Sequence, residues 1–150
     1  MQLQLIRLMS DSLKIDASGL DELRKYLKTL PKEAEKTIAL IVAGASAEAE
    51  ADAKRLVPVD NGDLRKSIYS LQTKDPLVYE IGATEPYAPY VEFGTGGKVD
   101  VPNELTDLAI QYKRPNLQNI SQEPQPYLYP AVKLARIEIL ERLKIQYPKQ

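Results

Sequence analysis

The stretch that decides the fold is KEAEKTIALIVAGASAEAEADAKRL, residues 32–56, which lies between Pro31 and Pro58. Its apolar side chains recur every three or four residues, as on one face of a helix. We expect a helix of about 25 residues, roughly 37 Å long. A core helix is favoured over a dedicated partner surface, although a helix of this length predicts an end that overhangs and meets another subunit. Alanine makes up much of the apolar face, so another element can pack close to the helix axis. The face consists of Ile38, Ile41, Val42, Ala45, Ala49, Ala53 and Leu56.

The residues before this helix predict a strand and a shorter helix. Residues 13–17 alternate apolar and polar side chains, as in a half-buried strand. Ser18 then offers an N-cap, with Asp21 in the position of a capping box. Leucines at helical spacing continue to Leu30, where a proline ends the helix.

The residues after the long helix predict a turn. In VPVDNGD (57–63), Asn61 and Gly62 are turn formers, and Asp60 is placed to cap the backbone amides that they lead. A calcium loop that uses Asp60 and Asp63 is the alternative. The spacing of oxygen ligands in an EF-hand is not reproduced, so the cap is favoured.

An antiparallel hairpin is expected next. Residues 68–73 and 77–81 each alternate in the manner of a strand, and Lys74-Asp75-Pro76 supplies the connecting turn. The stretch YAPYVEFGTGG (87–97) follows directly, with three aromatic rings and three glycines.

The glycines of this stretch do not form a phosphate loop. That pattern needs a glycine five positions before the final Gly-Lys and a Ser or Thr after it, where this chain has Glu92 and Val99. We expect a short helix over 86–93, with Pro86 in its first turn and Glu92 solvated or salt-bridged, followed by a flexible loop from Gly94. The tyrosines could stack on bases, but several glutamates surround them, so packing in a corner is favoured. That corner consists of Tyr87, Tyr90, Val91 and Phe93.

The C-terminal third predicts a long loop and a two-faced helix. Residues 94–126 contain one helical candidate, Glu104–Tyr112, and so long a connection is usually functional or disordered until bound. The closing helix extends to about Tyr147 and has an inward stripe of Val132, Ala135, Ile139 and Leu143. Further apolar residues on its other side indicate a possible subunit interface. These are Leu134, Ile137 and Ile145.

Composition excludes several kinds of site. The chain has 150 residues, most simply one domain over 1–150, and a formal net charge of −1, without the basic excess typical of proteins that bind nucleic-acid backbones. It contains no Cys and no His, so disulfides, thiolate or imidazole zinc sites and Ser-His-Asp triads are impossible. Neither a signal peptide nor an apolar stretch long enough to span a bilayer is present, which predicts synthesis in the cytoplasm.

Two chemical hypotheses remain open. A hydrolase based on carboxylates would use Asp60, Asp63 or Glu92. A role in contacting DNA would use Lys98, Lys113 and Arg114. Local spacing places no second carboxylate beside Glu92, which disfavours catalysis.

Three segments, in this order and after an Ala-rich helix, resemble the phage neck and tail-completion family, which includes head–tail joining, morphogenesis and minor tail proteins of long-tailed phages. The segments are LVPVDNGDLRKSI (56–68), PYAPYVEFGTGG (86–97) and PQPYLYPAV (124–132). Asn61 replaces the usual threonine, and Tyr127 stands where phenylalanine is common. The loop between the second and third segments shows no clear match. The residues that match are Pro58, Val59, Asp60, Gly62, Leu64, Ser67 and Ile68, then Tyr87, Ala88, Val91, Glu92, Phe93, Gly94 and Thr95, then Pro126, Pro130 and Ala131.

The resemblance implies an α+β fold, in which the long Ala-rich helix and the C-terminal helix pack on a small antiparallel sheet. It implies a structural protein, not an enzyme, that assembles as a ring at the head–tail junction or upper tail. Its partners would be copies of itself and neighbouring neck or tail proteins, and it would meet nucleic acid only by passage through a channel. No cofactor, metal or membrane is implied. The protein would be found in the bacterial cytoplasm during assembly and in the virion neck or tail afterwards.

Overall fold

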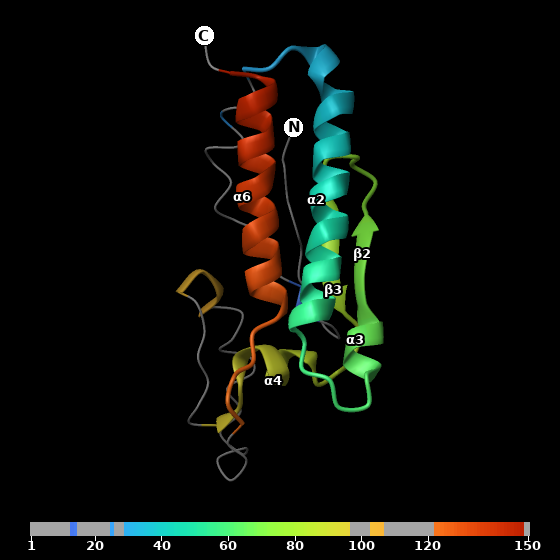
Figure 1. Cartoon of the computed structure of the whole chain (residues 1–150), viewed down its shortest axis with the longest axis vertical. Coiled ribbons are helices and arrows are strands. Elements are labelled where there is room, and N and C mark those ends of the chain that lie inside the picture. Colours follow the sequence, from blue (N-terminus) through green and yellow to red (C-terminus); the bar gives the residue numbers. More distant parts are fainter. Residues whose placement is uncertain (1–12, 15–24, 26–28, 97–102, 107–121, 149–150) are drawn as a thin grey trace.

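The computed structural model describes residues 13–14, 25, 29–96, 103–106 and 122–148 (Figure 1). The predicted strand over 13–17 is represented by β1 (Leu13–Lys14). The helix predicted after Ser18 lies almost entirely outside the described residues. So does most of the loop over 94–126. A 3-10 turn over Asn103–Leu105 overlaps the first two residues of the helical candidate Glu104–Tyr112, most of which lies outside the described residues.

Two long antiparallel helices form the body of the molecule (Figure 1). A 3-10 turn over Lys32–Ala34 leads into α2 (Glu35–Leu56), which has 22 residues and is about 33 Å long. The second is α6 (Leu128–Gln146), which packs along α2. No described helix is long and apolar enough to cross a membrane.

The hairpin is confirmed and forms most of a three-stranded sheet. β2 (Ile68–Gln72) pairs antiparallel with β3 (Tyr79–Ala83), and β1 pairs with the other edge of β3, which gives the order β1-β3-β2. At the turn, the amide of Thr73 donates to the carbonyl of Val78 at 3.0 Å. The fold is therefore α+β, as expected.

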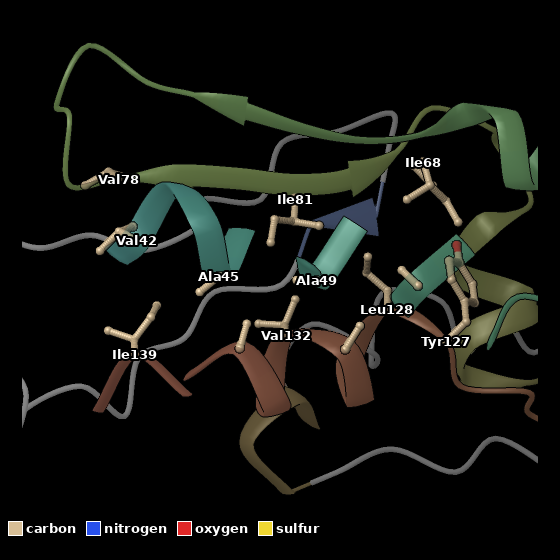
Figure 2. Packing of buried hydrophobic residues seen from close by; sticks show 14 of the residues in the cluster. Val42, Ala45, Ala49, Ile68, Val78, Ile81, Tyr127, Leu128, Val132 and Ile139 are labelled. Carbon is tan, nitrogen blue, oxygen red and sulfur yellow. The ribbon is translucent and has the colours of Figure 1, made fainter. Parts of the chain in front are cut away.

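The core lies where the sheet and α6 meet α2 (Figure 2). Ala45, Ala49 and Ala53 are at most 1% exposed. Their short side chains let Ile81 of β3 and Val132 of α6 approach the helix axis, as the Ala-rich face predicted.

The predicted face of α2 is wrong at Leu56, which is 50% exposed because it is the last residue of the helix. Ile41 is partly buried and packs against the core. Ser46 is buried instead, and its hydroxyl donates to the carbonyl of Val42 at 2.7 Å. Because this bond satisfies the hydroxyl within the helix, a serine can be buried on a face where the sequence pattern predicts only apolar residues.

Two short helices complete the described fold at one end of the long pair (Figure 1). α3 (Asp63–Ser67) follows the turn after α2, and α4 (Ala88–Phe93) follows the sheet. Both lie near the beginning of α6, which brings segments far apart in the sequence together.

Candidate functional site

The three segments singled out in the sequence meet at this end of the molecule. The first forms the turn from α2 into α3, the second forms α4, and the third begins α6. We call this region the junction and define it by residues 57–67, 87–95 and 122–130. Hydrogen bonds join its segments, and three of them are accepted by a buried carboxylate.

Glu92 of α4 holds the first turn of α6. One carboxylate oxygen accepts the amides of Tyr127 and Leu128 at 2.8 and 2.9 Å, and the other accepts the amide of Tyr129 at 2.9 Å. The first amides of a helix have no partner within the helix. Three of them bond to Glu92, and the next residue, Pro130, has no N–H to satisfy. Glu92 therefore caps the whole N-terminus of α6.

The prediction that Glu92 is solvated or salt-bridged is wrong. The residue is 1% exposed, and its partners are backbone amides from a segment 35 to 37 positions away. The negative charge faces the positive end of the α6 dipole, which favours it there. The sequence did contain a signal, since Tyr127-Leu128-Tyr129 begins a helix without a Ser, Thr, Asp or Asn cap.

Burial sets the electrostatics of the junction. Removal from water raises the pKa of the Glu92 carboxyl above its ordinary value, while the three amide bonds act in the opposite direction. The ring of Tyr127 is fully buried, and burial together with the charge of Glu92 raises the pKa of its hydroxyl. Among the described residues, no group forms a hydrogen bond with that hydroxyl.

The end of α4 is joined to the segment before α6. The amide of Thr95 donates to the carbonyl of Gln122 at 3.0 Å, and the Thr95 hydroxyl accepts the amide of Gln122 at 2.9 Å. The amide of Gln125 donates to the carbonyl of Val91 at 2.8 Å. Gly94 makes the exit from α4 possible, because its φ of 76° with ψ of −176° is open essentially to glycine alone. The two ends of the long loop are thus fastened together.

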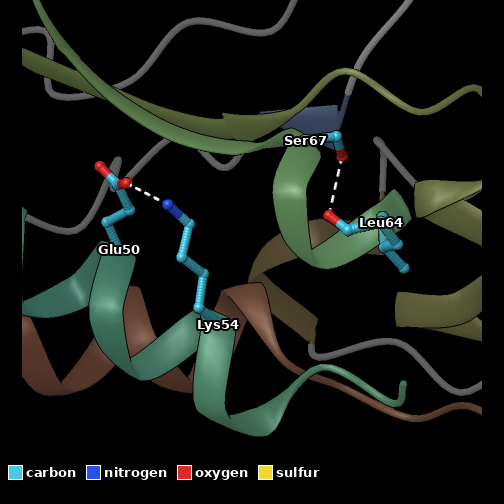
Figure 3. Close-up of polar contacts among 4 residues, drawn as sticks. All are labelled: Glu50, Lys54, Leu64 and Ser67. Atoms are coloured by element: carbon cyan, nitrogen blue, oxygen red, sulfur yellow. Dashed lines mark hydrogen bonds and ion pairs between the residues drawn. The ribbon is translucent and has the colours of Figure 1, made fainter. Parts of the chain in front are cut away.

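The turn before α3 is also built differently from the prediction. The amide of Asp63 donates to the side-chain oxygen of Asn61 at 3.1 Å, so Asn61 supplies the cap that was assigned to Asp60. An Asx side chain reaches the amide two residues on, which is that of Asp63 for Asn61 and that of Gly62 for Asp60. Gly62 precedes α3 with a φ of 84°. The hydroxyl of Ser67 donates to the carbonyl of Leu64 at 2.8 Å, which closes α3 (Figure 3).

The short helix of the second segment also starts later than expected. It begins at Ala88, so Pro89 and not Pro86 occupies its first turn. Of the predicted corner, Phe93 and Val91 are buried and Tyr90 is partly buried. Ala88, which was not predicted as part of it, is buried as well. Tyr87 is the exception, with 40% of its surface exposed.

Tyr87 instead borders a groove of about 450 Å³ between the turn before α3 and α4. Partial burial and the charges of Glu85, Asp63 and Asp60 raise the pKa of its hydroxyl. Among the described residues that line it, apolar side chains are combined with carboxylate and amide groups, and none is a Lys or Arg. The lining residues are Pro58, Val59, Asp60, Asn61, Gly62, Leu64, Tyr87, Tyr90, Val91, Gln122 and Gln125.

The junction does not support the hydrolase hypothesis through Glu92, because both of its oxygens bond to backbone amides. Asp60 and Asp63 are exposed on the turn. The described residues contain no group of three acidic side chains arranged to hold a metal. Lys98, Lys113 and Arg114 of the DNA hypothesis lie outside the described residues.

The remaining sequence-predicted residues lie in α6 or just before it. Pro126 precedes α6, and Pro130 lies in its first turn. The inward stripe of α6 is confirmed, since Val132, Ala135, Ile139 and Leu143 are all buried. Leu134, Ile137 and Ile145 are 55%, 45% and 80% exposed. Whether they form an interface stays a prediction.

Part of the chain matches the model of a known protein family. Residues 21–94 match the HK97-gp10-like family, described as "Bacteriophage HK97-gp10, putative tail-component". The match spans α2, α3, the hairpin and α4, and thus the first segment and most of the second, up to Gly94. It confirms the resemblance to phage neck and tail proteins. No curated protein and no solved structure matches the chain.

Proposed function

Because residues 21–94 match a phage tail-component family, we propose that this chain is a structural subunit of the head–tail junction or upper tail, which assembles with copies of itself into a ring. It is made in the cytoplasm of the bacterial host and ends in the neck or tail of the virion. Its partners are its own copies and the neighbouring neck or tail proteins. DNA meets it only by passing through the ring.

The main structural support for the proposed assembly is the second apolar face of α6. We define the outer face of α6 by its exposed residues Lys133, Leu134, Ile137, Glu141, Lys144 and Ile145. Three of these are large and apolar, while the core of the subunit is already complete without them. Single exposed leucines are common on monomers, but three on one helix face favour an interface.

The construction of the junction supports a mechanical role over a catalytic one. Its one buried carboxylate fixes α6, and its glycines and prolines shape turns and helix starts. A subunit held in this way presents α6 in a defined orientation. Identical rigid subunits that contact each other through two different surfaces close into a ring when the rotation between them permits.

Light scattering over a wide concentration range, with and without the neighbouring neck proteins, tests this proposal. We expect assembly of the wild-type chain under at least one of these conditions, and loss of assembly in Leu134→Ser/Ile137→Ser/Ile145→Ser. Leu40→Ser is the matched control, because Leu40 is 74% exposed on α2 and lies outside the outer face of α6. A chain that stays monomeric and binds none of the neighbouring proteins would overturn the proposal.

A further inference from the structure

We propose that the groove between the turn before α3 and α4 receives the outer face of α6 from a second copy of this chain. The inference rests on the proposed ring assembly and names the two surfaces that would meet in it. It goes beyond the prediction that Leu134, Ile137 and Ile145 lie at an interface, because it identifies what covers them.

The groove is both apolar and acidic. Val59 on its rim is 61% exposed, and Tyr87 is also exposed beside it. Asp60 lines the groove, and Asp63 and Glu85 are near enough to Tyr87 to act on its hydroxyl. Lys66 offsets part of this charge, since its ammonium lies 3.7 Å from a carboxylate oxygen of Asp63. The surface therefore favours a partner that brings apolar side chains with positive charge.

The outer face of α6 has that character. Its three apolar residues are accompanied by Lys133 and Lys144, with Glu141 as the one acidic member. The neighbouring Glu138 is paired with Arg142 on the same helix and contributes little net charge. Lys133 lies over the ring of Tyr129 at 6.0 Å and remains exposed to solvent. Charge and polarity thus complement the groove.

The two surfaces cannot meet within one molecule. α6 is fastened at its N-terminus by Glu92 and packed along α2, so its exposed side cannot turn toward the groove. The groove is lined by residues of the turn before α3, of α4 and of the segment before α6, whereas Ile145 lies in the last turn of α6. The two ends of α6 lie at opposite ends of the long helix pair (Figure 1). Filling the groove with this face requires another copy. The contact is heterologous and leaves a groove and a helix face open for further copies.

Disulfide trapping tests the contact directly, because the chain has no cysteine of its own. A Val59→Cys variant is mixed, at high protein concentration and under mild oxidation, with Leu134→Cys, Ile137→Cys or Ile145→Cys. We expect a crosslinked dimer in at least one mixture, at several times the yield obtained with Leu40→Cys, the exposed control on α2. Equal yields from all four mixtures, or no crosslink in any, would overturn the proposal.

Charge exchange gives a second readout on the same surfaces. Lys133→Glu/Lys144→Glu alone, or Asp60→Lys/Glu85→Lys alone, should weaken self-association by roughly two- to fivefold for each pair lost. Mixing the two variants should restore it. The same reversal at Lys36 and Lys74, which are exposed and away from both surfaces, is the control.

The outcomes separate this inference from the proposed function. If the wild-type chain assembles, but the groove variants neither crosslink nor weaken assembly, the proposed ring stands and the proposed groove contact is wrong. Groove variants that assemble normally but no longer bind a neighbouring neck protein assign the groove to that protein, which also overturns the inference. Absence of any assembly or neck-protein binding counts against the proposed function itself.

Discussion

Glu92 shows how much of this fold depends on one side chain. It replaces the cap that α6 lacks in its own sequence and joins two segments 35 positions apart. Sequence patterns describe neighbours along the chain, so local spacing around Glu92 shows neither its burial nor its partners. The cap before α3 has a local cause: Asp60 and Asn61 are adjacent candidates for it, and Asn61 is the one that bonds to the amide of Asp63.

Removing the Glu92 carboxylate should be costly. In Glu92→Ala three amides at the start of α6 lose their acceptor, and we expect a loss of about 2–4 kcal/mol in the free energy of unfolding. Urea unfolding followed by circular dichroism measures this. Glu141→Ala, on the exposed side of the same helix, should change stability by less than about 0.5 kcal/mol. Equal effects of the two substitutions would contradict the capping role.

The pH dependence of stability should show the burial of Glu92. Because burial raises the pKa of Glu92 in the folded protein, the folded state binds a proton more tightly than the unfolded state. As the pH rises from the ordinary pKa of a carboxyl group to the raised pKa of Glu92 in the folded protein, the free energy of unfolding of the wild type should fall relative to that of Glu92→Gln. Above the folded pKa the difference should be constant. Urea unfolding of both proteins at a series of acid to neutral pH values checks the sign. If the wild type instead gains free energy of unfolding relative to Glu92→Gln as the pH rises, the amide bonds lower the pKa of Glu92 by more than burial raises it.

The buried hydroxyl of Tyr127 contributes no hydrogen bond among the described residues. Tyr127→Phe should therefore keep the wild-type stability or gain up to about 1 kcal/mol, because an unsatisfied buried hydroxyl is unfavourable. Tyr127→Ala should lose about 3–5 kcal/mol through the cavity it leaves. Thermal and urea unfolding of both variants distinguish the ring from its hydroxyl. A clear loss in Tyr127→Phe would mean that the hydroxyl has a partner in the folded protein.

At the scale of elements, the long helices, their C-terminal ends and the hairpin were predictable, while the first residues of α2 and α4 were not. The faces of α2 and α6 and the turn at Lys74-Asp75-Pro76 follow from periods and turn formers that are visible locally. Leu56 continues the α2 period but lies at its last turn, where it is half exposed. The start of α6 at Leu128 depends on Glu92, which the fold brings from a distant segment, whereas α4 begins at Ala88 with local hydrogen bonds.

The alanines of α2 set how closely the sheet and α6 approach it. Ala49→Leu should therefore lose about 1–3 kcal/mol through overpacking, since Ala49 is 1% exposed. Ala51→Leu is the matched control, because Ala51 is an exposed alanine two positions away in the same helix. We expect it to change the free energy of unfolding by less than about 0.5 kcal/mol. Similar losses in the two variants would mean that helix propensity, and not packing, determines the effect.

At the scale of the whole molecule, the outer face of α6 carries three large apolar residues that lie outside the core cluster. Leu134→Ser/Ile137→Ser/Ile145→Ser should therefore unfold within about 1 kcal/mol of the wild type when both are monomeric. Chemical denaturation at low protein concentration measures this separately from assembly. A large loss in the free energy of unfolding would mean that these residues contribute to the stability of the single chain, and the main support for an interface would be gone.

The fastening of Thr95 to Gln122, beside the bond from Glu92 to α6, has a consequence for how such a protein can diversify. A connection whose two ends are pinned by the scaffold can change length at small cost, about 0.6 kcal/mol for each doubling. Changes of length between Thr95 and Gln122 leave both bonds in place, provided that Leu105, which lies between them in the sequence and is buried in the core, is kept. Under the proposed assembly, this segment can therefore vary to suit different neighbours while the two long helices and the sheet keep their arrangement.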